Sequence, residues 1–495
     1  MIKRFFFLFV ILSCSLFAQN DIPGLIYKGL DYSYNFQFRQ AEDCFQQIID
    51  KYPDDARGYH YKSGVYLWTY LSNKEKSELD KFMKFSDFAI DKAKKMLDNN
   101  DNDENALYVL GANYGFRAMV YAKESSSFDA VRAAKNSGRY LNKTLETNPH
   151  NNDAYMGKGL LSFAFSFVPG VFKWVLNLAG FSGSVEEGID YLQKAYKYGR
   201  YSKTEASYYL SQIYSEILVD YSAAANYLQP VIKKYPYNTL FKYSLAVVEI
   251  KDRKPQLAEK LLKEIIKADN SKFTQVTAFS NFLLGDILFH GNDFTQAIVY
   301  YQKFLSTTHD FDYSGIAYFR TALCYELSGN RSEAQRNYIL ARNGNLDVAD
   351  DIYAKRKSEI YYDCALTEHE MILIKSANMI ESGKFTEAFE VLNQLLPKLS
   401  SEKLKAEADL YMSDALFETG RVNESIDFAN KATRLNAKEE KWIKPFALYF
   451  AARGYAKTGG RVPAKKNLEQ AEDMSGYDYQ QKLKGYINAL KITIQ

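Results

Sequence analysis

Few side chains in this sequence have the types and spacing that catalysis or metal binding requires. Histidine occurs only at positions 60, 150, 290, 309 and 369. His369-Glu370 opens like a zinc-protease helix, but Leu373 stands where the second histidine ligand is needed. The turn at 182–184 (Ser-Gly-Ser) lacks the Gly-Lys-Ser/Thr ending of a phosphate-binding loop. With no cysteine pair at zinc spacing and no Gly-x-Ser-x-Gly turn, the sequence predicts no enzyme, no metal and no cofactor.

A recurrent pattern of small and aromatic residues identifies the elements that make up the chain. Gly29, Ala41, Phe45 and Pro53 fall at positions 8, 20, 24 and 32 of a 34-residue helical-hairpin repeat of the tetratricopeptide type. Small residues at positions 8 and 20 let two antiparallel helices approach closely, and the aromatic residue fills the space beside them. The proline ends the second helix, because it lacks an N–H donor.

The same pattern returns along most of the chain. Position 20 of successive repeats is occupied by Ala224, Ala258, Ala297, Ala334, Ala388, Ser425 and Ala464. The steps between these anchors are 34, 39, 37, 54, 37 and 39 residues. We therefore predict an all-α fold of helical hairpins stacked into a right-handed superhelix. The long step contains the polar stretch 343–370, a predicted hinge between a first array (19–342) and a second array (371–495).

The first helix of each hairpin is expected to line the concave groove of such an array, at repeat positions near 5, 9 and 12. The candidates for partner binding are Tyr209, Ile213, Tyr243, Val247, Phe282, Asp286, Phe289, Phe319 and Leu323. Repeats that clamp a C-terminal carboxylate need Lys, Arg or Asn donors, whereas this set is mostly aromatic and aliphatic. It favours a protein or peptide partner with an apolar segment.

The alternative is that lengthened helices close this groove and bury the same side chains. Charging Phe282 or Phe289 separates the two cases. An open groove would lose partner capture with stability unchanged, and a closed one would lose stability.

The most apolar internal stretch, 157–196, is interrupted at its centre by Pro169-Gly170. Its apolar part, 159–181, is long enough to span a bilayer. Since a proline breaks the helical hydrogen-bond ladder, two short helices packed inside the array are the favoured interpretation. A membrane-facing hairpin and a ligand-gripping element remain as alternatives.

The segment 167–195 resembles the signature of the tetratricopeptide repeat protein 39 family, which includes the yeast inclusion-body clearance protein. The shared features are an apolar helix, a proline break, a second apolar helix and the run Gly180-Phe181-Ser182-Gly183 followed by Gly188. The following segment, 227–266, resembles the next repeat of that family. The resemblance implies tetratricopeptide architecture and non-enzymatic partner binding. Its eukaryotic members act inside cells, so their cellular roles are not carried over to a chain that begins with an export signal.

The N-terminus has the layout of a secretory signal peptide over residues 1–18. Lys3 and Arg4 precede an apolar run, and Ala18-Gln19 forms a cleavage site. Cys14 offers a second interpretation, because the residues before it loosely match a bacterial lipoprotein box. The remaining cysteines, at 44, 324 and 364, are few and odd in number for an exported protein, so disulfide bonds are not expected to hold the fold together.

Charge excludes one class of partner. Lys and Arg number 63 against 60 Asp and Glu, a net charge of +3, which gives no strongly positive field for nucleic acid. The sequence therefore predicts an exported repeat scaffold for protein–protein interaction in the periplasm or cell envelope. The alternative function is a membrane- or lipid-associated envelope protein, anchored through 159–181 or a lipidated Cys14.

Overall fold

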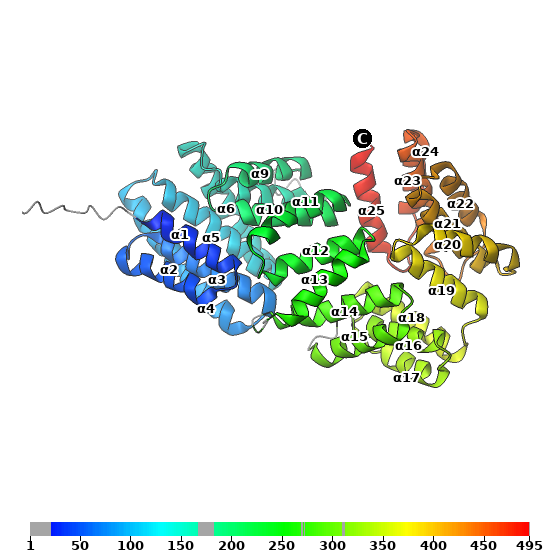
Figure 1. The fold of residues 1–495 in the computed structure, drawn as a ribbon. Helices are drawn as coiled ribbons and strands as arrows, with labels where there is room; N and C mark the ends of the chain where they lie inside the picture. Colours follow the sequence, from blue (N-terminus) through cyan, green and yellow to red (C-terminus); the bar gives the residue numbers. More distant parts are fainter. Residues whose placement is uncertain (1–20, 167–182, 269–270, 272, 309–311, 495) are drawn as a thin grey trace, which may run out of the picture. The chain divides into compact units, whose positions relative to one another are not determined.

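The computed structural model describes residues 21–166, 183–268, 271, 273–308 and 312–494. Over these ranges the chain forms 24 α-helices and one short 3-10 turn, and no strand (Figure 1). The predicted all-α helical-hairpin fold is confirmed. The predicted signal peptide (1–18), including Cys14, lies outside the described residues, as does most of the apolar stretch 159–181.

The helices of the N-terminal part are α1 (Ile22–Tyr34), α2 (Phe38–Lys51), α3 (Ala56–Asn73), α4 (Lys76–Asn99), α5 (Glu104–Lys123), α6 (Ser127–Thr147), α7 (Ala154–Ser166) and α9 (Val185–Tyr198). The next group comprises α10 (Lys203–Glu216), α11 (Tyr221–Lys234), α12 (Thr239–Lys251), α13 (Pro255–Lys267), α14 (Thr274–His290), α15 (Phe294–Thr307), α16 (Ser314–Leu327) and α17 (Arg331–Ala341). The last group comprises α18 (Ala349–Asp363), α19 (Glu368–Glu381), α20 (Phe385–Leu395), η1 (Leu396–Lys398), α21 (Glu402–Glu418), α22 (Val422–Arg434), α23 (Ile443–Lys457), α24 (Arg461–Glu472) and α25 (Gln480–Thr493).

The chain divides into two compact units. The first contains residues 1–188 and 199–201, and the second contains 189–198 and 202–495. The predicted hinge at 343–370 lies inside the second unit, where α18 packs against α16 and α17. The division of the array at that hinge stays a prediction.

The small and aromatic positions of the repeat meet as their spacing requires. A Cβ atom added to Gly29 would lie 2.4 Å from the ring of Phe45, and one added to Gly285 would lie 2.7 Å from the ring of Tyr301. Any larger residue at either glycine would collide with an aromatic ring of the paired helix. These contacts show why each hairpin needs a small residue on its first helix and a bulky one on its second.

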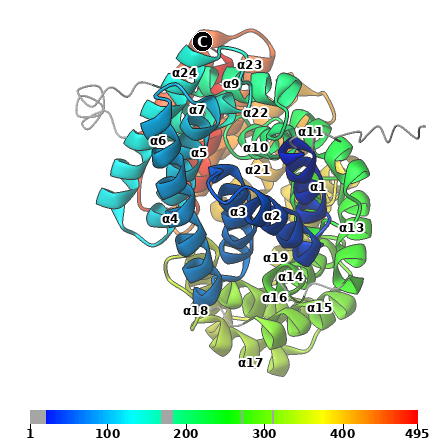
Figure 2. The ribbon, with the colours of Figure 1, turned by 90° about the vertical axis from the view of Figure 1, so that its left-hand side faces the viewer.

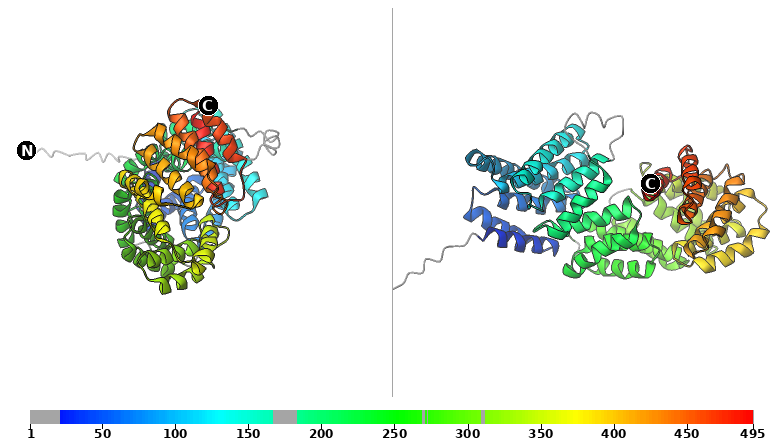
Figure 3. Two further views of the ribbon diagram at one scale, coloured as in Figure 1. Left: turned by 90° about the vertical axis from the view of Figure 1, so that its right-hand side faces the viewer. Right: turned by 90° about the horizontal axis from the view of Figure 1, so that it is seen from above.

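Consecutive hairpins of the second unit stack with their first helices adjacent. Helices α14 and α16 face the interior of that unit, and α15 and α17 lie on its outer rim (Figure 2). The core between them contains Phe304, Tyr301 and Tyr338, all fully buried. The array ends in α25, which packs on α23 and α24 through Leu483 and Ile487 (Figure 3).

The described flanks of the apolar stretch are joined by polar contacts. The Ser162 hydroxyl on α7 donates to Glu187 on α9 at 2.7 Å, and the Ser184 N–H donates to the Ser162 oxygen at 3.2 Å. A Cβ atom on Gly183 would lie 2.4 Å from the Ser162 carbonyl oxygen, so the chain approaches α7 closely here. None of the helices in the described ranges has the length and hydropathy needed to cross a membrane.

The three described cysteines are all free. Cys44 and Cys324 are buried, and Cys364 is exposed. Burial is the main cause of the raised pKa of Cys44, and Cys324 titrates higher still for the same reason. Both therefore stay as thiols that fill the core.

Candidate functional site

The nine candidate groove residues all lie on first helices of hairpins in the second unit. Helix α10 carries Tyr209 and Ile213, and α12 carries Tyr243 and Val247. The others are Phe282, Asp286 and Phe289 on α14 and Phe319 and Leu323 on α16. The structure thus brings them onto the first helices of four successive hairpins, and it gives them different degrees of burial.

Four of these side chains belong to the hydrophobic core. Phe282, Phe289, Phe319 and Leu323 are at most 5% exposed and pack with α14–α17. The Phe282 ring, for example, lies 5.1 Å from that of Phe304 and 5.7 Å from that of Tyr313, centre to centre. Charging Phe282 is therefore expected to destabilise the fold, so it is a poor test of partner binding.

The earlier helices keep this surface more accessible. Tyr209, Tyr243 and Val247 are half-buried, whereas Ile213 is 4% exposed. Burial raises the pKa of Tyr243, and the nearby charges of Tyr313 and Asp286 raise it further. Burial likewise raises the pKa of Tyr209. Both phenols stay protonated at neutral pH, and their role in binding stays a prediction.

The Asp286 carboxylate is held in an ion pair with Arg320. Its carboxylate accepts hydrogen bonds from the Tyr301 hydroxyl at 2.7 Å and from the Arg320 guanidinium at 2.5 Å. Arg320 also lies over the Phe282 ring, 5.8 Å from its centre. Burial lowers the pKa of Arg320, but the charge of Asp286 more than offsets this and holds the guanidinium ionised.

Arg320 and Asp286 belong to a larger charged surface, which we call the inner face. It consists of Tyr243, Arg253, Asp286, Arg320, Tyr353, Glu381, Asp414, Arg453, Tyr479 and Lys482. These residues come from eight helices and two inter-helix turns, all within the second unit. Their charges act on one another, so the interior of this unit is polar and rich in tyrosine.

Ion pairs on the inner face join repeats that are far apart in sequence. Asp414 on α21 accepts from Arg253, in the turn after α12, at 2.5 Å and from Arg453 on α23 at 2.7 Å. Burial raises the pKa of Asp414, but the two guanidiniums outweigh it and bring the pKa to about 2. Because Asp414 is buried and doubly paired, it acts as a cross-link between the start and the end of the unit.

Two further contacts make the same kind of connection. The Asn378 side chain on α19 donates to the Phe289 carbonyl at the end of α14, at 2.9 Å. Glu440, before α23, accepts from Arg356 and Lys357 of α18, each at 2.7 Å. No spacing rule in the sequence marks these partners, because each pair is separated by more than 80 residues.

The C-terminal helix α25 contributes aromatic side chains to the interior. The Tyr486 ring stacks on Tyr449 of α23 with 5.7 Å between centres, and its hydroxyl hydrogen-bonds with Tyr221 at the start of α11. Tyr479, just before α25, lies 5.3 Å from the Tyr353 ring of α18. Helix α25 is therefore placed between the first and last hairpins of the unit, as Figure 1 also shows.

In the described ranges no group of three or more His, Cys, Asp or Glu could hold a metal ion. His60 and Asn113 in the first unit hydrogen-bond at 2.7 Å, and burial lowers the pKa of His60 to about 3. A histidine that stays neutral and is enclosed by aromatic rings serves packing.

Comparison with known proteins identifies the repeat type. Residues 116–346 match the family model of Iml2/Tetratricopeptide repeat protein 39, and residues 24–55 match a tetratricopeptide repeat model. No curated protein matches the sequence.

Solved structures with helical repeats resemble the chain at low identity. Yeast Tom70 is 15% identical, with 95% of this chain and 96% of that chain covered and a TM-score of 0.24. The P58(IPK) TPR domain is 15% identical, with 82% and 94% covered and a TM-score of 0.20. A tetratricopeptide repeat protein from Parabacteroides merdae is 14% identical, with 58% and 98% covered and a TM-score of 0.23.

Proposed function

The chain belongs to the Iml2/tetratricopeptide repeat protein 39 family, and on that basis we propose that it is an exported, non-enzymatic scaffold that binds a partner protein through its second unit. Its tetratricopeptide repeats support a role in protein–protein interaction. The observation that carries the proposal is the half-buried surface of Tyr209, Tyr243 and Val247. This surface lies on α10 and α12, the first helices of two successive hairpins. On the next two first helices, α14 and α16, the corresponding side chains are buried.

The chemistry of this surface favours an apolar segment of a partner. Two tyrosine rings and a valine offer aromatic and aliphatic contact at a low cost in side-chain entropy, and aromatic residues of this kind anchor protein interfaces. Tyr243 lies near the charges of the inner face, which would orient backbone donors and acceptors of the bound segment.

Affinity capture tests this assignment. The mature chain, residues 19–495, is immobilised and exposed to envelope extract of its own source, and bound proteins are identified after cross-linking. The double variant Tyr209→Ala/Tyr243→Ala is expected to lose most of the captured partner. Tyr237→Ala is the matched control, because Tyr237 is 76% exposed on the same unit and outside this surface. Equal capture by both variants would contradict the proposed surface.

Export is tested on the N-terminus of the purified protein. Mass spectrometry is expected to find a chain that begins at Gln19. A chain that begins with a lipid-modified Cys14 would instead support the lipoprotein alternative. Retention in the membrane fraction after a high-salt wash would support a membrane- or lipid-associated protein over a scaffold free of the membrane.

A further inference from the structure

A pocket of about 350 Å³ opens between helices α21 and α22 and the end of α20. We call it the Asp409 pocket, and Leu396, Lys405, Asp409, Lys431, Arg434 and Leu435 line it. Its volume lies near the lower end of the range of about 300–1,000 Å³ for ligand sites. It therefore has room for one large side chain.

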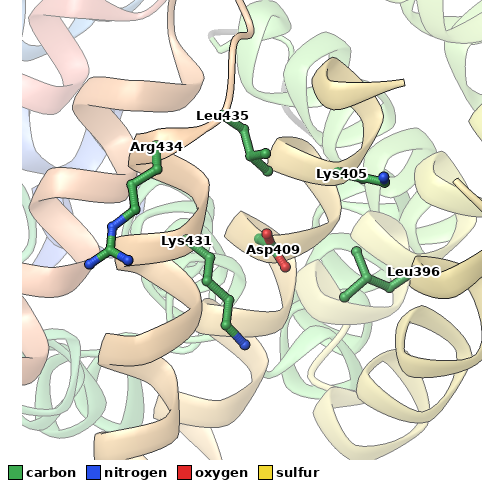
Figure 4. A pocket seen from close by; sticks show the side chains of 6 residues that line it. All are labelled: Leu396, Lys405, Asp409, Lys431, Arg434 and Leu435. Atoms are coloured by element: carbon green, nitrogen blue, oxygen red, sulfur yellow. The ribbon is translucent and has the colours of Figure 1, made fainter. Parts of the chain in front are cut away.

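Asp409 lies at the centre of this pocket, between Leu396 and Lys431 (Figure 4). The residue is only 4% exposed, and its Oδ1 atom has no hydrogen-bond partner in the described part of the chain. Burial is the main cause that raises the pKa of Asp409, and Lys431 and Lys405 only partly oppose it. A buried acceptor left without a donor is costly. A donor brought by a ligand would remove that cost.

Three cationic residues line the pocket together with the acid. Lys431 and Arg434 are exposed and Lys405 is half-buried, and none of the three has a carboxylate within ion-pair distance among the described residues. With Asp409 ionised, the four charges sum to about +2. The pocket thus combines one buried acceptor, an excess of positive charge at its mouth and two leucine walls.

These features select the ligand class. A phosphate or a nucleic-acid backbone would satisfy the cations, but its negative charge would be repelled by the carboxylate of Asp409. A phosphodiester also offers that carboxylate no donor. A lysine or arginine from a partner would reach Asp409 only past three like charges. A neutral hydroxyl on an aromatic ring avoids both problems, because the ring can lie against the leucines and beneath Lys431 or Arg434. Carboxylates on either side of it would pair with the cations.

We propose that the Asp409 pocket binds an acidic peptide segment of a partner protein, inserting one tyrosine whose hydroxyl donates to Oδ1 of Asp409. This site is separate from the surface of α10 and α12. Asp409 precedes Asp414 of the inner face by five residues, which places it roughly 140° away around α21. The proposal can therefore hold or fail independently of the partner capture described above.

Direct titration of the mature chain tests the pocket. The probe is a fluorescent, end-blocked peptide with two glutamates on each side of a tyrosine, followed by fluorescence anisotropy at low salt. Two further peptides replace the tyrosine with phenylalanine or the glutamates with lysines. We expect the tyrosine peptide to bind about tenfold tighter than the phenylalanine peptide, and the lysine peptide not to bind.

Variants locate the binding site. Lys431→Glu is expected to weaken binding of the acidic peptide by at least about tenfold. Lys465→Glu makes the same charge change at an exposed position of α24, and it is expected to weaken binding by less than about twofold. Asp409→Asn is expected to reduce the preference for tyrosine over phenylalanine. If Lys431→Glu does not fold, Arg434→Gln replaces it.

Three results would overturn the proposal. The first is equal binding of the tyrosine and phenylalanine peptides to the unmodified chain. The second is that Lys465→Glu on α24 weakens peptide binding as much as Lys431→Glu does. The third is displacement of the peptide by inorganic phosphate or short single-stranded DNA at lower concentration than by unlabelled peptide, which would assign the pocket to an anion.

Discussion

Two aspartates on helix α21 have opposite electrostatic environments. Asp414 faces the inner face, where Arg253 and Arg453 contact it and hold its pKa at about 2. Asp409 faces its own pocket, where burial raises its pKa to about 6 and its Oδ1 atom has no partner. Both residues are almost fully buried, at 5% and 4% exposure. The difference therefore comes from pairing and not from burial.

The comparison separates a structural role from a candidate binding role. Asp414 pairs with Arg253, which lies 161 positions earlier in the chain, so its charge contributes to closing the second unit. The Oδ1 atom of Asp409 has no hydrogen-bond partner among the described residues, and its burial costs stability. Residues that reduce stability without a compensating contact are often found at functional sites. On this argument the two acids should respond in opposite directions to loss of charge.

Removal of the Asp414 charge should have the largest effect. Asp414→Asn leaves Arg253 and Arg453 with weaker carboxylate partners, and we expect the free energy of unfolding to fall by about 3–5 kcal/mol. Urea unfolding followed by circular dichroism measures it. Asp473→Asn, at an exposed position, is the control and should change stability by less than about 0.5 kcal/mol. A loss below about 1 kcal/mol for Asp414→Asn would mean that the cross-link is not needed.

The same ion pairs predict an acid-dependent loss of stability. The pKa of Asp414 falls from 3.8 to about 2 on folding, so its ionised form stabilises the folded state above pH 3.8. This contribution, about 2.5 kcal/mol, should disappear as the pH falls through 2. The gap in stability between the unmodified chain and Asp414→Asn should therefore narrow between pH 4 and pH 2. A stability difference that stays constant between pH 4 and pH 2 would contradict the stabilising role of the ionised Asp414.

Asp409→Asn should raise the free energy of unfolding, whereas Asp414→Asn should lower it. The pKa of Asp409 rises from 3.8 to about 6 on folding, so the ionised form destabilises the folded state, and this cost is complete above pH 6. We expect the asparagine variant to be more stable by about 2 kcal/mol at pH 7.5 and to gain little at pH 4. Thermal unfolding at the two pH values measures the difference. Destabilisation at pH 7.5 would show that the carboxylate is paired in solution.

The smallest effect should come from a conservative change in the cross-link. Arg453→Lys keeps a positive charge near Asp414 but cannot bond Asp414 and Glu418 together as the guanidinium does, at 2.7 and 3.2 Å. It also loses the planar group that lies over the Phe417 ring, 3.8 Å from its centre. We expect a loss of about 1 kcal/mol in the same urea experiment. A loss equal to that of Asp414→Asn would show that Arg453 alone carries the pairing.

The hairpins could be predicted from sequence, because their determinants are close together in the chain. The glycine at position 29 and the phenylalanine at 45 are separated by 16 positions, and their contact requires only that two adjacent helices pack. The repeat pattern also placed the candidate groove residues on the first helices. It could not distinguish Phe282, which enters the core, from Tyr243, which is half-buried, because the burial of each residue depends on how closely successive hairpins stack.

By itself the sequence determined the helical-hairpin repeat and the match of residues 116–346 to the Iml2/Tetratricopeptide repeat protein 39 family model, since both depend on short-range spacing of small, aromatic and proline residues. Only the tertiary structure decided which charges meet. Arg253 and Asp414 come together because the second unit curves until its early and late repeats touch, and no local pattern encodes that curvature. Asp409 lies on another side of α21 from Asp414, and its Oδ1 atom has no hydrogen-bond partner among the described residues.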